Sequence, residues 1–309
     1  MKRVIVTGAS GFIGWELSKK LLLDGVTVYG IGRDKTRLHN LNQYGDFHPV
    51  QAGFEEYSKL DMLISERGFD WFYHLAWQGT GSNTNDFHDY NVQLMNAKAA
   101  CDAASAAVSL GCAGCSCSSS YQEANVAIQE GICLNPTYYG ITKRSANALF
   151  QAIAYKNDIR CINLVFPNTY GVHDKPNTAI VFFIKNLLLS NPLNLIRGEF
   201  PDDWMPVNDL VDGIMAASHT KGKYADYYIG HRQITTFKQK LMEMKNALGS
   251  SSELLWGKYP EESYVDYKRF DLEALHRDTG WEAKTDFVDS IRQTAAWIKE
   301  TMIVSDEGK

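Results

Sequence analysis

Apolar positions at the start of the chain follow first one spacing and then another. Val4 to Val6 form a short β-branched run that is typical of a buried strand, whereas Ile13, Leu17 and Leu21 recur as on one face of a helix. Similar patterns predict strands over residues 26–31, 47–52, 70–76, 112–118, 160–166 and 227–230, and helices over 91–104, 139–153 and 290–299. Strands that alternate with helices indicate an α/β fold with a doubly wound parallel sheet.

The segment from Cys112 to Ser118 fits this pattern least well. A central parallel strand is normally a near-continuous apolar run, but every residue of this segment is small. Propensity alone would favour a loop. We nevertheless expect a strand here, because the alternating pattern on either side requires one.

A glycine-rich turn joins the first strand to the first helix. Gly8, Gly11 and Gly14 are spaced three residues apart, which allows a tight turn, a close approach of the backbone to a pyrophosphate, and close packing of helix on strand. The helix N-terminus adds free N–H groups and a partial positive charge. The predicted dinucleotide contacts in this turn are Gly8, Ser10, Gly11, Phe12, Ile13 and Gly14. The alternative is that the glycines only turn the chain.

The end of the second strand bears on the choice of dinucleotide. An acidic residue there would bind the ribose hydroxyls of NAD, whereas an arginine suits the 2′-phosphate of NADP. Arg33, followed by Lys35 and Arg37, favours NADP, and Asp34 leaves NAD open. A solvated, charged turn without a role in binding is the alternative interpretation.

Three residues predict the chemistry. Tyr139 and Lys143 are four residues apart on a predicted helix, so their side chains share one face. A phenol has a pKa near ~10, and a nearby ammonium group would lower it for acid–base work at neutral pH. Ser120, at the end of the small-residue strand, would hydrogen-bond the substrate oxygen that Tyr139 protonates or deprotonates. We therefore predict Ser120, Tyr139 and Lys143 as the catalytic residues.

Two ambiguities remain in this assignment. Tyr264 and Lys268 have the same spacing as Tyr139 and Lys143, but no serine-tipped strand precedes them. Ser118, Ser119 and Ser120 all lie near the end of the predicted strand, so spacing alone does not choose among them.

The glycine turn, as it stands TGASGFIG, resembles that of the short-chain dehydrogenase/reductase superfamily, and most closely its NAD-dependent epimerase/dehydratase family. The segment 70–76 is similar to this family's D-x-x-x-H-L-A strand, and 168–171 to its N-x-Y-G turn. The resemblance implies a Rossmann-type NAD(P)-binding domain over 1–166, to which a later strand near 205–230 returns. It also implies a smaller, mainly substrate-binding α/β domain over 167–309.

Individual site residues follow from the same resemblance. Leu75, Ala76 and Pro167 would border the cofactor, and Glu123, in an S-x-x-E element, selects Ser120 among the three serines. Segment 202–209 resembles the element R-D-x-x-x-V-x-D that borders the sugar-nucleotide pocket, but Asp202 replaces its arginine. The implied substrate contacts are Ser120, Asn168, Trp204, Arg232 and Lys258, with Arg197 as another candidate for the missing basic group.

The resemblance implies an enzyme that acts on a nucleotide-linked sugar. The string Trp77-Gln78-Gly79 looks most like the branch with the CDP-abequose and CDP-paratose synthases, which implies reduction of a 4-keto sugar with NADPH. The same catalytic residues would serve an NAD-dependent 4-epimerase. A non-catalytic NADP-sensing regulator is the alternative from another class, although such proteins usually lose the Tyr/Lys pair.

Composition and charge bear on the partners and the location of the protein. A net charge of −5 argues against a nucleic-acid partner, and no apolar run is long enough for a membrane span, so we expect a cytoplasmic protein. The six cysteines are expected to be free thiols, and the close spacing of Cys112, Cys115 and Cys117 lacks the second ligand pair of a zinc site. By analogy with relatives that pair through the tyrosine-bearing helix, we expect a homodimer.

Overall fold

The computed structural model describes residues 1–309 except 127, 130–131, 134–136, 177, 260–264 and 304–309. The predicted C-terminal tail from 304 and Tyr264 of the second Tyr/Lys pair lie outside the described residues. Within the described part, no helix is long and apolar enough to cross a membrane.

A seven-stranded sheet forms the centre of the larger lobe, and every neighbouring pair of its strands is parallel. Its spatial order is β12 (Tyr224–Tyr228), β8 (Arg160–Phe166), β5 (Gly114–Ser120), β4 (Trp71–His74), β1 (Arg3–Thr7), β2 (Thr27–Gly32) and β3 (Phe47–Gln51). The strand order reverses between β1 and β4, which is the switch point where ligands bind in such folds. The predicted doubly wound parallel sheet is confirmed.

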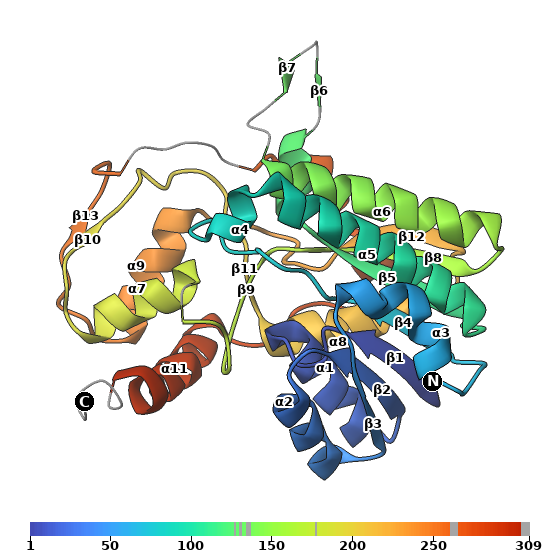
Figure 1. Ribbon diagram of the computed structural model, residues 1–309. Helices are drawn as coiled ribbons and strands as arrows, with labels where there is room; N and C mark the ends of the chain where they lie inside the picture. Colours follow the sequence, from blue (N-terminus) through green and yellow to red (C-terminus); the bar gives the residue numbers. More distant parts are fainter. Residues whose placement is uncertain (127, 130–131, 134–136, 177, 260–264, 304–309) are drawn as a thin grey trace.

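Helices cover both faces of this sheet (Figure 1). One face carries α3 (Leu60–Leu63), α5 (Tyr90–Ser109) and α6 (Tyr138–Lys156); the other carries α1 (Phe12–Leu23), α2 (Lys35–His39), α8 (Val207–Ser218) and α10 (Ala274–Thr279). Each layer has its own buried apolar cluster, so the sheet is buried on both sides.

The small-residue segment does form a central strand, β5, and all of its residues are buried. The helix above it is rich in alanine, so it packs close to the strand. Small side chains also leave space for the large ones of β4, because a Cβ at Gly114 would lie 2.2 Å from the ring of Trp71. The indole N–H of Trp71 donates to the Ser116 hydroxyl at 3.1 Å. Packing rather than strand propensity therefore explains β5.

The second lobe is smaller and lies at the carboxyl ends of the strands (Figure 1). It contains α7 (Ala179–Leu188), α9 (Phe237–Ala247), α11 (Phe287–Ile298) and two short parallel pairs, β9 (Asn168–Tyr170) with β11 (Trp204–Pro206) and β10 (Leu193–Asn194) with β13 (Leu254–Leu255). These helices enclose a third apolar cluster. The remaining elements are α4 (Asn85–His88) and the antiparallel pair β6 (Ile128–Gln129) and β7 (Ile132–Cys133).

Residues after 167 do not all belong to the smaller lobe. Helix α8 packs on α1, and β12 pairs with β8 at the edge of the main sheet. The chain thus returns to the larger lobe near residues 207–228.

Candidate active site

A cleft of about 560 Å³ lies at the carboxyl ends of the central strands. Segments that follow five of the strands line it: Gly8–Gly14 after β1, Gly32–Asp34 at β2, Leu75–Trp77 after β4, Ser118–Ser120 at β5 and Phe166–Thr169 at β8. This is the position that the doubly wound topology reserves for a ligand. All predicted cofactor residues of the glycine turn, together with Arg33, Leu75, Ala76 and Pro167, line this one cleft.

The glycine turn has the shape that a dinucleotide requires. Gly8 has φ of 73°, and a Cβ at Gly14 would lie 2.1 Å from the Gly8 carbonyl oxygen, so a larger residue does not fit at either position. Gly11 begins α1 without any side-chain cap, which leaves the first N–H groups of the helix available. The loop and the helix end therefore form a cradle that fits the pyrophosphate of NAD or NADP.

Arg33 and Asp34 both line the cleft, but only Asp34 has a structural task there. Its carboxylate accepts the backbone N–H of Arg37 at 2.9 Å and caps α2. The guanidinium of Arg33 lies next to Gln78, to which it donates at 3.3 Å. The last residue of β2 is Gly32, so no acidic side chain projects from the strand end itself.

The three predicted catalytic residues converge on the same cleft. Thr137 caps α6 by accepting the N–H of Gly140 at 2.9 Å, which fixes Tyr139 in the first turn and Lys143 one turn later. Ser120 lies close enough to Tyr139 for its hydroxyl group to lower the pKa of the phenol. The Lys143 ammonium donates to the Ser118 carbonyl oxygen at 3.1 Å. Strand end and helix start thus bring a serine, a phenol and an ammonium together.

The electrostatics differ from the sequence-based expectation. Burial raises the pKa of Tyr139 to about 12; the nearby Ser120 side chain opposes this rise and the negative charge of Glu123 adds to it. Burial also lowers the pKa of Lys143 to about 8. The prediction that Lys143 makes Tyr139 unusually acidic is therefore wrong for this cofactor-free geometry, because desolvation of the phenol outweighs a cation that lies 5.9 Å from the ring centroid.

The three serines at the end of β5 have different partners. The Ser120 hydroxyl accepts the Gln122 N–H at 3.3 Å and lies close enough to Tyr139 to lower the pKa of the phenol. The Ser119 hydroxyl donates to the Glu123 carboxylate. Ser118 contributes its carbonyl oxygen to Lys143. Glu123, which selected Ser120 by motif, thus bonds to the neighbouring Ser119.

Asn168 is held in one orientation at the floor of the cleft. Its side-chain oxygen accepts the Tyr121 hydroxyl at 2.9 Å, and its amide donates to Asp202 at 3.0 Å. Asp202 also accepts the Trp204 indole N–H at 2.7 Å and the Tyr267 hydroxyl at 3.5 Å. Burial raises the pKa of Asp202 to about 7. Where the family motif has an arginine, this chain therefore has a buried carboxyl group that fixes an asparagine.

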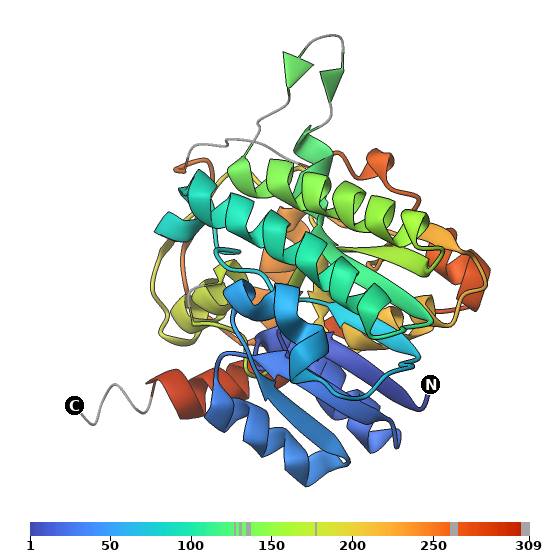
Figure 2. The same ribbon diagram turned by 45° about the vertical axis from the view of Figure 1, so that its right-hand side comes forward.

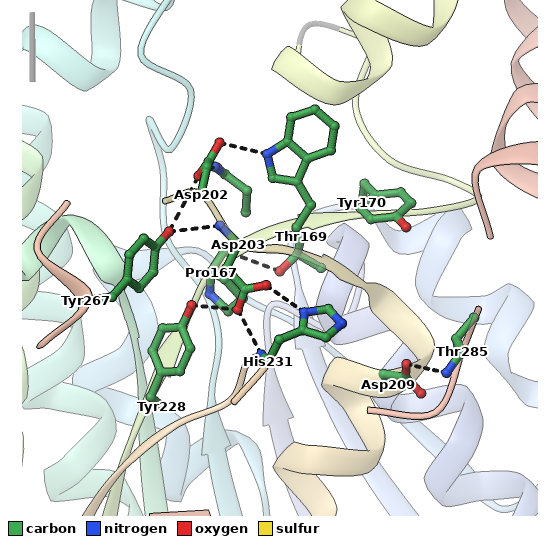
Figure 3. A network of polar contacts seen from close by, with 12 residues as sticks. Pro167, Thr169, Tyr170, Asp202, Asp203, Asp209, Tyr228, His231, Tyr267 and Thr285 are labelled. Atoms are coloured by element: carbon green, nitrogen blue, oxygen red, sulfur yellow. Dashed lines mark hydrogen bonds and ion pairs between the residues drawn. The ribbon is translucent and has the colours of Figure 1, made fainter. Parts of the chain in front are cut away.

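A second buried acid continues the network (Figure 3). Asp203 accepts the Tyr228 hydroxyl at 2.8 Å and lies 2.6 Å from the His231 ring nitrogen. Tyr267 connects the two acids, since its hydroxyl also accepts the Asp203 N–H at 3.1 Å. The network ties β11 to the loop after β12 and supports the Asn168 side of the cleft from behind.

Three predicted substrate contacts do not line the cleft. Trp204 is buried in the core of the smaller lobe. Arg232 forms surface ion pairs with Glu273 at 2.7 Å and Glu282 at 3.5 Å, and Lys258 is exposed. Within the described residues the cleft lining excludes Arg197 as well. The basic residues that were predicted to replace the family's arginine, Arg197, Arg232 and Lys258, therefore do not line this cleft.

The structure adds cleft residues that sequence reasoning missed. Lys175 and Asp174 line the cleft from the segment after β9, and Trp77 lines it from the loop after β4. Trp77 was visible only as part of a branch-specific string, and Lys175 had no motif around it. Tyr121 lines the floor beside Asn168 and directly follows the catalytic strand, which was the one available signal.

Five of the six cysteines have side chains that the structure describes. The five whose side chains the structure describes are free, and Cys112, Cys115, Cys117 and Cys161 are buried. In the described part of the chain, no group of three or more His, Cys, Asp or Glu side chains is arranged to hold a metal ion.

Known proteins share this fold over nearly the whole chain. The UDP-glucose 4-epimerase of Thermotoga maritima, solved with UDP-glucose, superimposes with a TM-score of 0.79 at 20% identity, covering 97% of this chain and 99% of that one. The UDP-glucuronic acid 4-epimerase of Bacillus cereus, solved with UDP-glucuronic acid and NAD, gives a TM-score of 0.77 at 21% identity, covering 96% and 99%. At these identities the likeness establishes the fold.

Sequence similarity establishes the family. A Bacillus subtilis protein, described as the uncharacterised UDP-glucose epimerase YtcB, is 30% identical over 69% of this chain and 72% of its own length. The profile of the NAD dependent epimerase/dehydratase family matches residues 4–230. The chain therefore belongs to the NAD-dependent epimerase/dehydratase family, enzymes of the short-chain dehydrogenase/reductase type.

Proposed function

We propose that the protein is an NAD(P)-dependent oxidoreductase that reduces the 4-keto group of a nucleotide-linked sugar. The observation that supports this most directly is the meeting of Ser120, Tyr139 and Lys143 at the same cleft as the glycine cradle. A hydride donor seated on the cradle and a carbonyl group held by Ser120 would both lie beside Tyr139.

Each residue has a defined task in this reaction. NADPH, when bound, supplies the hydride that adds to the carbonyl carbon. Ser120 donates a hydrogen bond to the carbonyl oxygen, and Tyr139 donates the proton that turns this oxygen into a hydroxyl group. Lys143 holds the nicotinamide ribose and offsets the charge left on the tyrosinate. Because its pKa is raised to about 12, Tyr139 is protonated at neutral pH, as a proton donor must be.

NADP is the cofactor that the cleft favours. Arg33 places a cation at the end of β2, Gly32 offers no carboxylate for ribose hydroxyls, and Asp34 is engaged as a helix cap. NAD, by contrast, is the dinucleotide named with the Bacillus cereus structure.

The substrate side of the cleft also carries a cation. Lys175 lines the cleft from the segment after β9, whereas the predicted basic residues Arg232 and Lys258 do not line it. We propose that Lys175 contacts the diphosphate of a nucleotide sugar and that the smaller lobe, with residues 167–309 as its main part, holds the substrate.

A nucleotide-sugar 4-epimerase is the second candidate. The names of the similar proteins favour it, since the Bacillus subtilis and Thermotoga maritima relatives are both named as UDP-glucose epimerases. An epimerase would use the same three residues but would start by removing a hydride, so Tyr139 would first have to act as a base. Arg33, which lines the cleft after β2 and favours NADP, favours reduction over this order of events.

Helices α5 and α6 present an unusually apolar outer surface. Their exposed apolar side chains are Tyr90, Leu94, Met95, Tyr138, Ile141, Leu149 and Tyr155. Figure 2 shows these two helices side by side with no other element in front of them. We propose that a second copy of the chain covers this surface in a homodimer.

One experiment separates these functions. Native mass spectrometry of the purified protein, followed by titration with NADPH and NADH, shows which dinucleotide is retained or preferred. Oxidation of NADPH in the presence of a 4-keto nucleotide sugar supports the reductase. Retained NAD and interconversion of two nucleotide sugars would instead identify the epimerase, and binding of NADPH without any turnover would identify a sensor.

A further inference from the structure

The ammonium group of Lys143 lies in an unusual environment. The residue is only 4% exposed, and its single hydrogen-bond acceptor among the described residues is the Ser118 carbonyl oxygen. Among the residues that the structure describes, no carboxylate lies within ion-pair distance of the Lys143 ammonium group. A buried cation normally requires such a partner, because removing an ammonium group from water is costly.

The face of an indole ring occupies the place of the missing counterion. The Nζ atom of Lys143 lies 3.9 Å from the centroid of the Trp77 ring. This is well inside the distance at which the negative face of an aromatic ring attracts a cation, and tryptophan is the strongest of the aromatic partners. Exclusion of water strengthens the attraction further.

Hydrogen bonds from α5 hold the indole ring in place. The Trp77 N–H donates to the Gln93 side-chain oxygen at 2.9 Å. Gln93 is completely buried and donates in turn to the carbonyl oxygens of Gly79 at 3.1 Å and Asp86 at 2.8 Å. Asn96 bonds both backbone groups of Gln78, at 2.8 and 2.9 Å. These bonds fix the ring itself and the loop directly after it, so the indole has little freedom to leave Lys143.

Other ionisable groups around Lys143 do not replace this contact. His74 on β4 is buried, and desolvation lowers its pKa to about 3, so it is neutral. Burial raises the pKa of the Cys117 thiol on β5, which is therefore uncharged at neutral pH. Glu123 attracts Lys143 from a distance, but its carboxylate bonds to Ser119 and Asn147. Tyr139 shares α6 with Lys143 and is protonated at neutral pH.

We propose that Trp77 is a positioning residue whose indole face substitutes for a counterion and holds the Lys143 ammonium, in its charged form, beside the Ser118 carbonyl at the cleft. The ring also contacts Tyr139 edge-on, with centroids 6.2 Å apart. The consequence for turnover rests on the proposed function, whereas the state of Lys143 in the free protein does not.

The test is a pH titration of the lysine side chains by NMR in the cofactor-free protein labelled at lysine Cε, with Lys143 assigned from its loss in Lys143→Arg. Trp77→Leu removes the ring face and Trp77→Phe keeps a weaker one. We expect the acid dissociation constant of Lys143 to rise by about tenfold in Trp77→Leu and by less in Trp77→Phe. Phe87→Leu is the matched control. The Phe87 ring stacks on the Tyr139 ring with centroids 5.0 Å apart, whereas the described rings near the Lys143 ammonium are those of Trp77 and Tyr139.

An unchanged titration of Lys143 in Trp77→Leu would overturn the proposal. If that variant does not fold, as judged by circular dichroism, the Trp77→Phe titration decides in the same way. The pH profile of turnover adds a second measure, in which the alkaline limb moves to lower pH in the order wild type, Trp77→Phe, Trp77→Leu. Absence of turnover with every nucleotide sugar would count against the proposed function alone, because the titration requires neither cofactor nor substrate.

Discussion

The carboxylate of Asp34 accepts the backbone N–H of Arg37 at 2.9 Å, and this bond separates the roles of two adjacent charged residues. Asp34 serves the start of α2, whereas the neighbouring Arg33 keeps its guanidinium at the cleft. The carboxylate of Asp34 is therefore engaged by the backbone, and the cation of Arg33 remains at the cleft.

Replacing Arg33 tests the preference for NADP. We expect Arg33→Ala to weaken NADPH binding by about tenfold to a hundredfold, because a charge-assisted hydrogen bond to phosphate is lost, and to leave NADH binding nearly unchanged. Fluorescence titration with both dinucleotides measures this. Lys35→Ala is the control, since Lys35 is exposed and does not line the cleft. Equal losses for NADPH and NADH in Arg33→Ala would contradict the assignment.

Lys175 and Arg232 make a matched pair on the substrate side. Lys175→Ala should raise KM for a nucleotide sugar about tenfold with little effect on NADPH affinity, since Lys175 is the member of this pair that lines the cleft. Arg232→Ala should leave KM unchanged, because Arg232 is paired with Glu273 and Glu282 at the surface. Steady-state kinetics with both variants decides, and the reverse order of effects would show that the substrate lies elsewhere.

The buried carboxyl group of Asp202 should make the free energy of unfolding depend on pH. Its pKa is raised from 3.8 to about 7 by burial, so the folded protein favours the protonated form. Ionisation of Asp202 therefore lowers the free energy of unfolding as pH rises from about 4 to about 7. Between about pH 5 and about pH 8, wild type should lose up to about 3 kcal/mol relative to Asp202→Asn. Urea unfolding at the two pH values measures this, and equal pH dependence in both proteins would refute it.

The outer surface of α5 and α6 predicts the oligomeric state. Leu149 is 50% exposed on this surface, and Leu149→Glu should convert a dimer into a monomer because it places a charge in the apolar contact. Light scattering after size-exclusion chromatography measures the mass. Met242→Glu is the control, since Met242 is 48% exposed on α9, away from this surface. A wild-type monomer would rule out the proposed interface.

The spacing of nearby residues was enough to predict those parts of the cleft whose residues are only a few positions apart in the sequence. The glycine turn and the pair Tyr139 and Lys143 each depend on neighbours three or four residues away. The small-residue strand β5 was the hardest to predict, because its stability comes from Trp71 and an alanine-rich helix that are distant in sequence.

Contacts between distant segments explain what the sequence could not provide. Arg232 forms ion pairs outside the cleft with Glu273 and Glu282, which lie 41 and 50 residues further along the chain. Trp77 meets Lys143 only after the fold has brought β4 and α6 together. The pKa of Tyr139 was predicted in the wrong direction because spacing reveals the nearby cation but not the burial of the phenol.

The central claim is that Tyr139 transfers the proton in a reaction at the dinucleotide cleft, and Tyr139→Phe tests it most directly. Turnover and NADPH affinity are measured on the same preparation, by absorbance with a 4-keto nucleotide sugar and by fluorescence titration. The proposed mechanism predicts that kcat falls by about 10²- to 10⁴-fold while the dissociation constant for NADPH stays within about twofold of wild type. A variant that turns over at the wild-type rate would show that the phenol does not take part in the chemistry.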